Sequence, residues 1–401
     1  MPEQNRTNNR KNRILAAIYL SLMMVLLGMS DAMRGVFLPV MRETYALSQA
    51  QGSAIIMLSY LGNLIFLTVG GMLIGKWTRK KFLCVMSCFW MAALTAYAFT
   101  KSVIVIYAGM IFSLGASTML STSVNLTTPL LFLSPTLFVN LFNFAQGVGI
   151  FISQNVGGRF SGKYSAWQHM NLIVLAGAAG CLLLLLLGLY IPDVVPAEKQ
   201  DSQKKTGNPL KAVFSHPAAK YLLMITGLYC IAEHGLQNWL VTYGSDYLGY
   251  TREQSAKFLS YFFLGLTVGR LILAPIVQKL GIMKSLLGAV TVGGVLYISG
   301  ILLGRGGIGL VCASGTMFSI LWPMTVLLIG SYYAPEHKGA ATSWITGLAN
   351  LFDIVFNACF GALAQSVGFG KAILVLPAAM LLYMVFMYLL RFRVKLPEYG
   401  D

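Results

Sequence analysis

The sequence predicts an all-α membrane protein with twelve transmembrane helices arranged as two six-helix halves. Three observations lead to this prediction: apolar runs of spanning length, an internal repeat, and a composition of 57% hydrophobic and only 10% charged residues in 401. Soluble domains carry about 25% charged residues, so this chain has too few to cover a water-facing surface. A large soluble enzyme or DNA-binding domain is therefore excluded.

Twelve apolar runs are long enough to cross a bilayer, which takes ~20 residues per helix. Short polar or glycine-rich turns separate them. The runs are continuous rather than alternating, so they predict helices and not a β-barrel. The predicted spans are Ile14–Leu38, Ala54–Ile74, Phe82–Phe99, Val103–Leu131, Phe138–Gly158, Met170–Ile191, Tyr221–Tyr243, Phe258–Val277, Leu286–Leu303, Ile308–Tyr332, Ala340–Leu363 and Ile373–Leu390.

The positive charge predicts orientation. The first span follows a basic segment like that of a signal peptide, but it is longer and lacks a small-residue cleavage site, so we expect a retained helix. With the N-terminus inside, nineteen Lys and Arg fall in inside segments and eight in outside segments, while Arg34 and Arg270 lie within spans. This bias predicts that both termini lie in the cytoplasm. We expect the membrane to be the inner (plasma) membrane of a bacterium. The net charge of +16 is then a topology signal, and we expect no nucleic-acid partner.

Motifs for metal, cofactor or covalent chemistry are not recognisable in the sequence. The six cysteines lie inside apolar runs and are interpreted as buried free thiols. A phosphate loop, a zinc motif and a nucleophile–base pair are all missing. We therefore expect no enzyme activity, no catalytic residue, no metal and no cofactor. The expected partners are a small-molecule substrate, protons and the lipid bilayer, with the chain as a monomer.

An internal repeat divides the chain. The polar segment 193–218 is predicted to be a cytoplasmic linker between an N-terminal half, 1–192, and a C-terminal half, 219–401. Similar residues recur at nearly constant offsets: Asp31 and Glu233 are 202 positions apart, and Gln146 and Asn350 are 204 apart. Parallel repeats of this kind occur in transporters whose binding site lies at the bilayer midplane between the halves.

Ionisable residues within spans are the first candidates for function, because each costs ~2.5–3.5 kcal/mol or more at the bilayer centre. Asp31, Glu233 and Asp353 are the predicted proton-coupling residues. Two alternatives stay open. Asp31 could instead form a structural pair with Arg34, one turn away. His234 could share a proton with a carboxylate or be a hydrogen-bonded structural histidine.

Polar and aromatic side chains in the spans predict a cavity for a polar solute. Asn350 and Asn357 flank Asp353 on one helix face, and such a stripe must face protein or a water-filled space. Each of these residues also has a structural alternative. The polar stripe could form contacts between helices, Trp239 could lie at the membrane interface, and Trp322 could simply accompany the bend at Pro323. The predicted substrate-binding residues are Asn125, Asn143, Gln146, Gln237, Asn238, Trp239, Trp322, Asn350 and Asn357.

The loop after the second span resembles the signature loop of the major facilitator superfamily, Gly-x-Leu-x-Asp-Arg-x-Gly-Arg-Arg/Lys. The matching residues are Gly71, Leu73, Lys76, Arg79 and Lys80, whereas Gly75 and Thr78 replace the usual Asp and Gly. The resemblance covers essentially the whole chain. It implies the major facilitator fold, transport by alternating access, and a gating loop formed by Gly71, Lys76, Arg79 and Lys80.

Within that superfamily the chain is most similar to the fucose and glucose/mannose proton symporter group. The similarity rests on Asp31, Pro39, Asn125, Glu233 and Trp239; a carboxylate that some members carry before the matched Asn125 is missing here. It implies proton-coupled symport of a sugar or related polyol. The alternatives are a proton-coupled exporter of organic anions or amphipathic compounds, and a transporter-shaped sensor that binds without transport.

Overall fold

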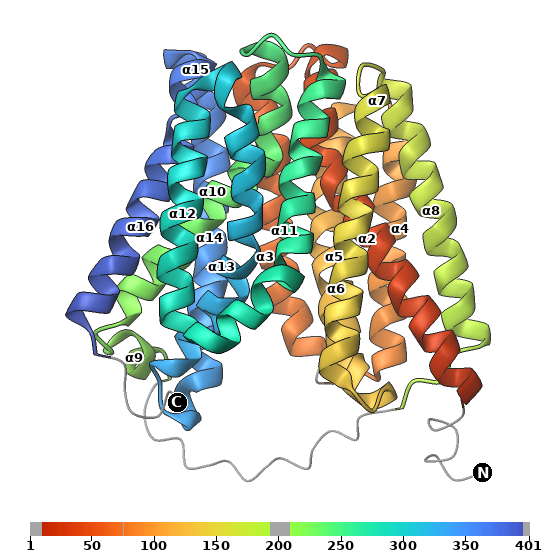
Figure 1. Ribbon diagram of the computed structural model, residues 1–401. Coiled ribbons are helices and arrows are strands. Elements are labelled where there is room, and N and C mark those ends of the chain that lie inside the picture. The colour runs from red at the N-terminus through yellow and green to blue at the C-terminus, as the bar shows by residue number, and fades with distance from the viewer. Residues whose placement is uncertain (1–9, 75, 193–208, 396–401) are drawn as a thin grey trace. The chain divides into compact units, whose positions relative to one another are not determined.

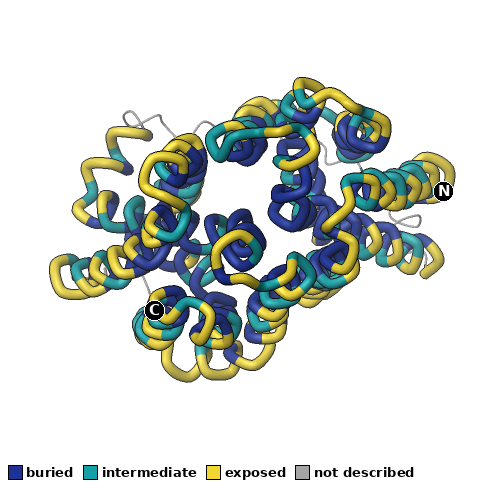
Figure 2. The backbone as a smooth tube through the Cα atoms, turned by 90° about the horizontal axis from the view of Figure 1, so that it is seen from above, coloured by how far each residue is buried: buried dark blue, intermediate teal, exposed yellow. Residues whose placement is uncertain are grey.

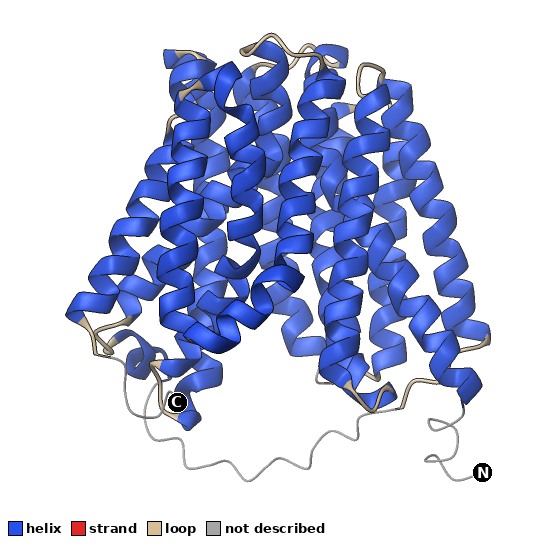
Figure 3. Ribbon diagram, viewed as in Figure 1, coloured by secondary structure: helices blue, strands red, loops and turns tan. Residues whose placement is uncertain are grey.

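The computed structural model describes residues 10–74, 76–192 and 209–395. These residues are almost entirely helical, and none of them forms a β-strand (Figure 3). The predicted all-α class is therefore confirmed. The chain separates into two compact units, one formed by the helices before residue 203 and one by those after it, with Ser48–Ser53 counted in the second.

The first unit contains a helix for each of the first six predicted spans (Figure 1). A π-helical turn, η1 (Ser153–Gly157), and the short α7 (Gly158–Phe160) continue α6. The main helices are α2 (Arg10–Thr44), α3 (Gln49–Ile74), α4 (Arg79–Phe99), α5 (Val103–Leu131), α6 (Pro135–Ile152) and α8 (Tyr164–Leu187).

The second unit contains a helix for each of the other six spans, preceded by the short α9 (Pro209–Phe214). A 3-10 turn, η2 (Gly304–Gly307), and the short α15 (Phe369–Ala372) lead into the fourth and sixth of these helices. The main helices are α10 (Ala219–Asp246), α11 (Arg252–Leu280), α12 (Ile282–Leu302), α13 (Ile308–Ser331), α14 (Pro335–Val367) and α16 (Val375–Arg393).

Helix pairing repeats between the two units. In the first unit α2 packs against α6 and α8, and α4 packs against α5 and α8. In the second unit the corresponding helices pair in the same way: α10 with α14 and α16, and α12 with α13 and α16. In each unit the buried residues gather on the faces that the helices turn toward one another (Figure 2). The six-helix repeat seen in the sequence thus corresponds to a repeated packing arrangement.

Eleven helices in the described part of the chain are long and apolar enough to cross a membrane. The remaining one of the twelve, α10, is 28 residues long but carries Glu233, His234, Gln237 and Asn238 in its interior. It tolerates these groups because α11, α14 and α16 pack around it, and every residue from Gly235 to Gly244 is buried. Polar side chains in a membrane helix normally face other helices in this way.

Local capping chemistry sets the start of two helices, α4 and α11. Thr78 caps α4 by accepting from Lys81 N at 3.3 Å, and Thr251 forms a capping box with Gln254 at the start of α11. Gly281 separates α11 from α12 with a φ of 76°, a conformation that favours glycine. The predicted span Met170–Ile191 is shifted: α8 begins at Tyr164 and its C-cap is Gly188, because the polar residues of its first turn continue the helix beyond the apolar run.

Part of the predicted linker is folded. Residues 193–208 of the 193–218 segment lie outside the described residues, but 209–214 form α9, which packs against α14 and α10. Tyr333 donates a hydrogen bond to Val213 O at 3.1 Å, and the His216 ring lies 4.8 Å from the Tyr333 ring. Burial lowers the pKa of His216 below its usual value and raises the pKa of Tyr333 to about 12, so both are uncharged near neutral pH.

Backbone contact between α2 and α6 generates a stability prediction. A Cβ atom on Gly28 would meet the carbonyl oxygen of Gln146, whereas a Cβ on Gly180 of α8 would meet nothing within 4 Å. Gly28→Ala should therefore destabilise the protein by about 1–3 kcal/mol through overpacking, measured as a lower melting temperature in detergent. The control Gly180→Ala should be neutral or slightly stabilising, because Ala has the higher helix propensity. Equal melting temperatures for the two variants would contradict the close contact.

Candidate functional site

Asp31 forms a contact between helices in the first unit. Its Oδ2 atom accepts a hydrogen bond of 2.9 Å from Ser117 Oγ, which joins α2 to α5. Arg34, one turn further along α2, lies over the ring of Tyr60 with its guanidinium carbon 5.5 Å from the ring centre. Among the described residues no ion pair within 4.0 Å joins Asp31 to Arg34, although the two charges interact electrostatically. Asp31 thus has a hydroxyl partner and an electrostatic interaction with Arg34, so both interpretations of Asp31 stay predictions.

Arg34 itself is a buried cation. Its side chain is 8% exposed, and its Nε and Nη1 atoms are buried without a hydrogen-bond partner. Buried charges usually pair with other charges or bind ligands, so an anionic group could be accommodated beside it.

Glu233 lies next to an aromatic pair in the second unit. It is half-buried on α10 and interacts with Tyr229, four residues earlier, by hydrogen bonding and charge. The Tyr229 ring in turn stacks on Trp322 of α13, with ring centres 5.7 Å apart and an interplanar angle of 29°. Arg270 of α11 acts on the same tyrosine electrostatically. The structure therefore groups Glu233 and Trp322, two predicted residues, around a tyrosine that sequence reasoning did not select.

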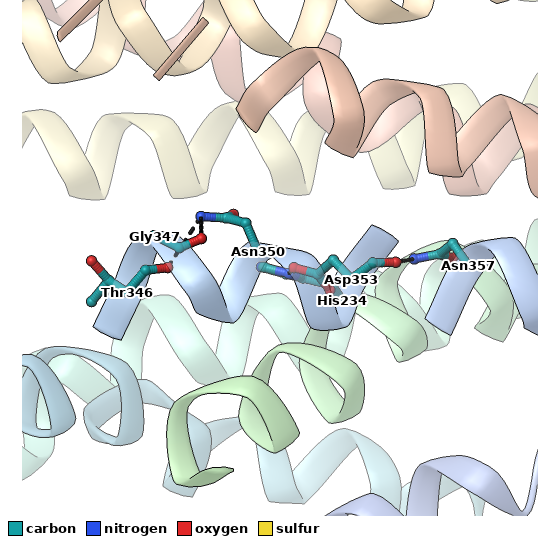
Figure 4. Close-up of polar contacts among 6 residues, drawn as sticks. All are labelled: His234, Thr346, Gly347, Asn350, Asp353 and Asn357. Atoms are coloured by element: carbon teal, nitrogen blue, oxygen red, sulfur yellow. Dashed lines mark hydrogen bonds and ion pairs between the residues drawn. The ribbon is translucent and has the colours of Figure 1, made fainter. Parts of the chain in front are cut away.

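Asp353 pairs with His234 (Figure 4). The Nδ1 atom of His234 on α10 lies 2.8 Å from Oδ2 of Asp353 on α14. The Asp353 side chain is 0% exposed, whereas the His234 side chain is 29% exposed. His234 was interpreted either as sharing a proton with a carboxylate or as a structural histidine. The geometry gives it a carboxylate partner, Asp353. The imidazole thus connects a fully buried acid to more accessible space.

The two asparagines that flank Asp353 are engaged by protein atoms. Asn350 donates to the carbonyl oxygens of Thr346 and Gly347 within α14 (Figure 4). Asn357 donates to Asp353 O at 2.8 Å and accepts from Trp239 Nε1 at 3.1 Å. Trp239 is 0% exposed. Trp239 and Asn357 thus join α10 to α14, which is the contact between helices considered as the alternative for this stripe; a role of either residue in binding a solute stays a prediction.

The other predicted cavity residues are more dispersed. Asn125 on α5 and Asn143 and Gln146 on α6 are half-buried, and in the described structure their side chains make no hydrogen bond. The Oδ1 atom of Asn125 is buried without a partner. Gln237 and Asn238 are buried in α10. The amides of Asn125, Asn143 and Gln146 remain able to bind a polar solute.

The predicted gating loop fixes helix ends within the first unit. Lys80 Nζ donates to the carbonyl oxygens of Leu186 and Leu189 at the end of α8, each at 3.3 Å, where a cation is favoured by the helix dipole. Arg79 donates to Ile74 O at 3.3 Å. Gly71 and Lys76 are exposed. The loop therefore connects the ends of α3, α4 and α8.

A partly open apolar cavity of about 460 Å³ lies at the surface of the second unit, where Leu351, Val355 and Cys359 are exposed. Nine side chains from α10, α14 and α16 line it, among them Ile231, Phe356 and Val375, and none of the nine is polar apart from the thiol of Cys359. Such a lining suits a hydrocarbon group better than a sugar.

Sequence reasoning missed Ser117, Tyr229 and Cys230. Tyr229 and Cys230 each lie four residues before a selected residue, Glu233 and His234, so helical spacing could have placed them on the same faces. Nothing local in the sequence connects Ser117 to Asp31, because the two are 86 positions apart.

The bond between Trp239 and Asn357 generates a prediction. Trp239→Phe keeps an aromatic side chain, though a smaller one, and leaves a buried Asn357 oxygen without its donor. It should lower stability by about 1–2 kcal/mol, the value that model peptides give for hydrogen bonds between membrane helices. The measurement is the melting temperature in detergent, with Trp344→Phe as the control because Trp344 is 45% exposed. A Trp239→Phe variant as stable as the control would show that this hydrogen bond does not stabilise the α10–α14 contact.

Comparison with known proteins agrees with the fold. The family model of the Major Facilitator Superfamily matches residues 20–317, well over half of the chain. The chain is 22% identical over 289 residues to an uncharacterized MFS-type transporter, YceJ, of Bacillus subtilis strain 168, a match covering 70% of this chain and 71% of that protein.

Three solved structures with similar folds are distant from this chain in sequence. A point mutant of the nucleoside transporter NupG gives a TM-score of 0.77 at 13% identity, covering 94% of this chain and 99% of the other. A D-xylose-proton symporter gives 0.76 at 13% identity over 97% and 99%. A point mutant of the Escherichia coli fucose:proton symporter FucP gives 0.66 at 15% identity over 96% and 100%. Spanning helices, the repeated six-helix packing and the family match lead to one conclusion: the chain is an integral membrane protein that belongs to the major facilitator superfamily, a family of transporters and not of enzymes.

Proposed function

We propose that this transporter carries a small polar solute, a sugar or related polyol, together with protons by alternating access. The observation that carries the proposal is the pair formed by His234 and Asp353, at 2.8 Å. A carboxylate that is 0% exposed is joined there to an imidazole that is 29% exposed. Histidine changes its charge near neutral pH, and ionisable groups inside a membrane are typical of proton relays.

Asp31 and Glu233 are the further proton-coupling residues of the proposal. Each is half-buried within a spanning helix and interacts with a hydroxyl group, Asp31 with Ser117 and Glu233 with Tyr229. A hydroxyl can donate to an ionised carboxylate and accept from a protonated one. Both protonation states can therefore be accommodated without rearranging the helices, which suits a group that loads and releases a proton in each cycle.

The proposed solute is neutral and polyhydroxylated. The stacked rings of Tyr229 and Trp322 lie beside Glu233, and aromatic faces pack against the apolar faces of sugar rings. Half-buried amides, among them Asn125, Asn143 and Gln146, supply donors and acceptors without charge. The similar solved structures include two sugar–proton symporters and a nucleoside transporter, which is in keeping with such a solute.

Location and assembly belong to the proposal as well. We place the protein in a bacterial plasma membrane as a monomer. The nineteen-to-eight distribution of basic residues supports both termini in the cytoplasm. The gating role of Gly71, Lys76, Arg79 and Lys80 is supported by the bonds of Lys80 to the end of α8.

A second candidate function is export of organic anions or amphipathic compounds. Two observations favour it. Arg34 presents buried N–H groups without partners in the first unit, and an apolar cavity of about 460 Å³ lies in the second. The first feature suits an anionic group and the second, in the other unit, suits a hydrocarbon group.

Solute-induced alkalinisation tests the main proposal. Membrane vesicles that contain the protein are given a panel of sugars, polyols and nucleosides while external pH is recorded. A symporter should raise the external pH with at least one of these solutes, because each solute entering takes protons with it. Vesicles from cells without the protein are the control. If no sugar or polyol gives a signal and an organic anion does, the second candidate replaces the first.

Substitution of the carboxylates separates coupling from binding. Glu233→Gln and Asp353→Asn should each abolish proton-driven accumulation and leave exchange of labelled solute across the membrane intact, because the binding site is retained but a titratable group is lost. Glu253→Gln is the matched control, since Glu253 forms an i,i+4 ion pair with Lys257 at the start of α11. Accumulation that survives Glu233→Gln would exclude Glu233 as a coupling residue, and the same holds for Asp353→Asn.

A further inference from the structure

Three potential metal ligands converge inside the second unit. The thiol of Cys230, an imidazole nitrogen of His234 and a carboxylate oxygen of Asp353 all lie within 4.8 Å of one another. Cys230 and His234 are one helical turn apart on α10, so they project from the same face, and Asp353 approaches from α14. Helix geometry thus holds two ligands on one helix and a third on its packing partner.

The cluster contains a polar atom that the protein leaves unsatisfied. Asp353 is 0% exposed, and its Oδ1 atom has no hydrogen-bond partner. The neighbouring thiol of Cys230 is a weak donor at most. A buried carboxylate oxygen without a strong donor is costly, and a bound cation would satisfy it. Glu233 adds further negative charge, since it also acts electrostatically on Cys230.

We propose that Cys230, His234 and Asp353 form a binding site for a divalent transition-metal ion of the Zn²⁺ type. A sulfur, a nitrogen and an oxygen ligand together suit Zn²⁺, whereas Ca²⁺ and Mg²⁺ require oxygen ligands. Bond lengths of about 2.0–2.3 Å set tetrahedral ligands about 3–4 Å apart, so the three side chains need only small shifts to coordinate. His234 is 29% exposed, which gives the ion a route to the buried ligands.

Binding releases a proton and replaces one hydrogen bond. The ion bonds to the Cys230 sulfur as the thiol loses its proton to solvent, and no oxidation or reduction occurs. The contact between His234 Nδ1 and Asp353 Oδ2 opens so that both atoms coordinate the ion, and a water molecule takes the fourth position. The bound ion would connect α10 to α14. The site does not depend on the proposed solute, but it shares His234 and Asp353 with the proposed proton relay, so a bound ion would compete with the proton for this pair.

Cobalt titration tests the site directly. The full-length protein is purified in detergent, treated with a chelator and titrated with Co²⁺, which reports thiolate ligation by a charge-transfer absorption band. We expect saturation near one Co²⁺ per chain, displacement of the band by Zn²⁺, and a higher melting temperature with Zn²⁺. Failure of the wild-type protein to develop the thiolate band would overturn the proposal, whatever the variants do.

Matched variants locate the site. Cys230→Ser should remove the thiolate band, and Asp353→Asn should weaken binding at least tenfold. Cys312→Ser is the control, because Cys312 lies in the same unit and donates to Phe258 O at 3.3 Å, outside the cluster. Size-exclusion elution and far-UV circular dichroism check that each variant is folded. A band that persists in Cys230→Ser, or that Cys312→Ser removes equally well, would assign the metal to other residues and contradict the proposal. Metal binding is read without transport, so its failure leaves the proposed function untouched.

Discussion

The need to satisfy polar groups inside a membrane-spanning bundle governs the arrangement of α10 and α14. Lipid offers no hydrogen bonds, so the imidazole and amides of α10 can exist only where another helix meets them. The contacts of His234 with Asp353 and of Trp239 with Asn357 supply those partners one after another along the two helices. The packing of α11 and α16 on α10 then excludes lipid from the polar face. The site and the stability of the second unit therefore rest on the same contacts.

The same constraint gives the two units different chemistry despite a common helix pairing. In the first unit the carboxylate of Asp31 accepts a hydrogen bond from one hydroxyl, that of Ser117. The buried guanidinium of Arg34 lies over the ring of Tyr60. In the second unit an acid, an imidazole, a thiol and an indole gather between two helices. A repeat fixes where helices lie, but the side chains at equivalent positions diverge.

The fold was predictable from sequence because its signals are local. Apolar runs identify the spans, and spacings of three and four residues placed Asn350, Asp353 and Asn357 on one face of α14. The partners of that face were not predictable, since His234 and Trp239 lie more than a hundred positions away on α10. Spacing could place Cys230 on the same helix face as His234, but the thiol itself gave no functional signal, because within an apolar run it resembles a small hydrophobic residue.

The close approach of α2 and α6 has a consequence for how the units can respond to their surroundings. A Cβ atom on Gly28 or Gly149 would meet a backbone carbonyl of the facing helix, so these two helices meet through main-chain atoms that do not titrate. The equivalent pair in the second unit, α10 and α14, meets through His234, Asp353 and other side chains. Of the two contacts with the same pairing, the first is set by backbone shape and the second by side-chain chemistry. A change of pH would therefore act directly on the α10–α14 contact and not on the α2–α6 contact, although the two pairs hold equivalent places in the repeat.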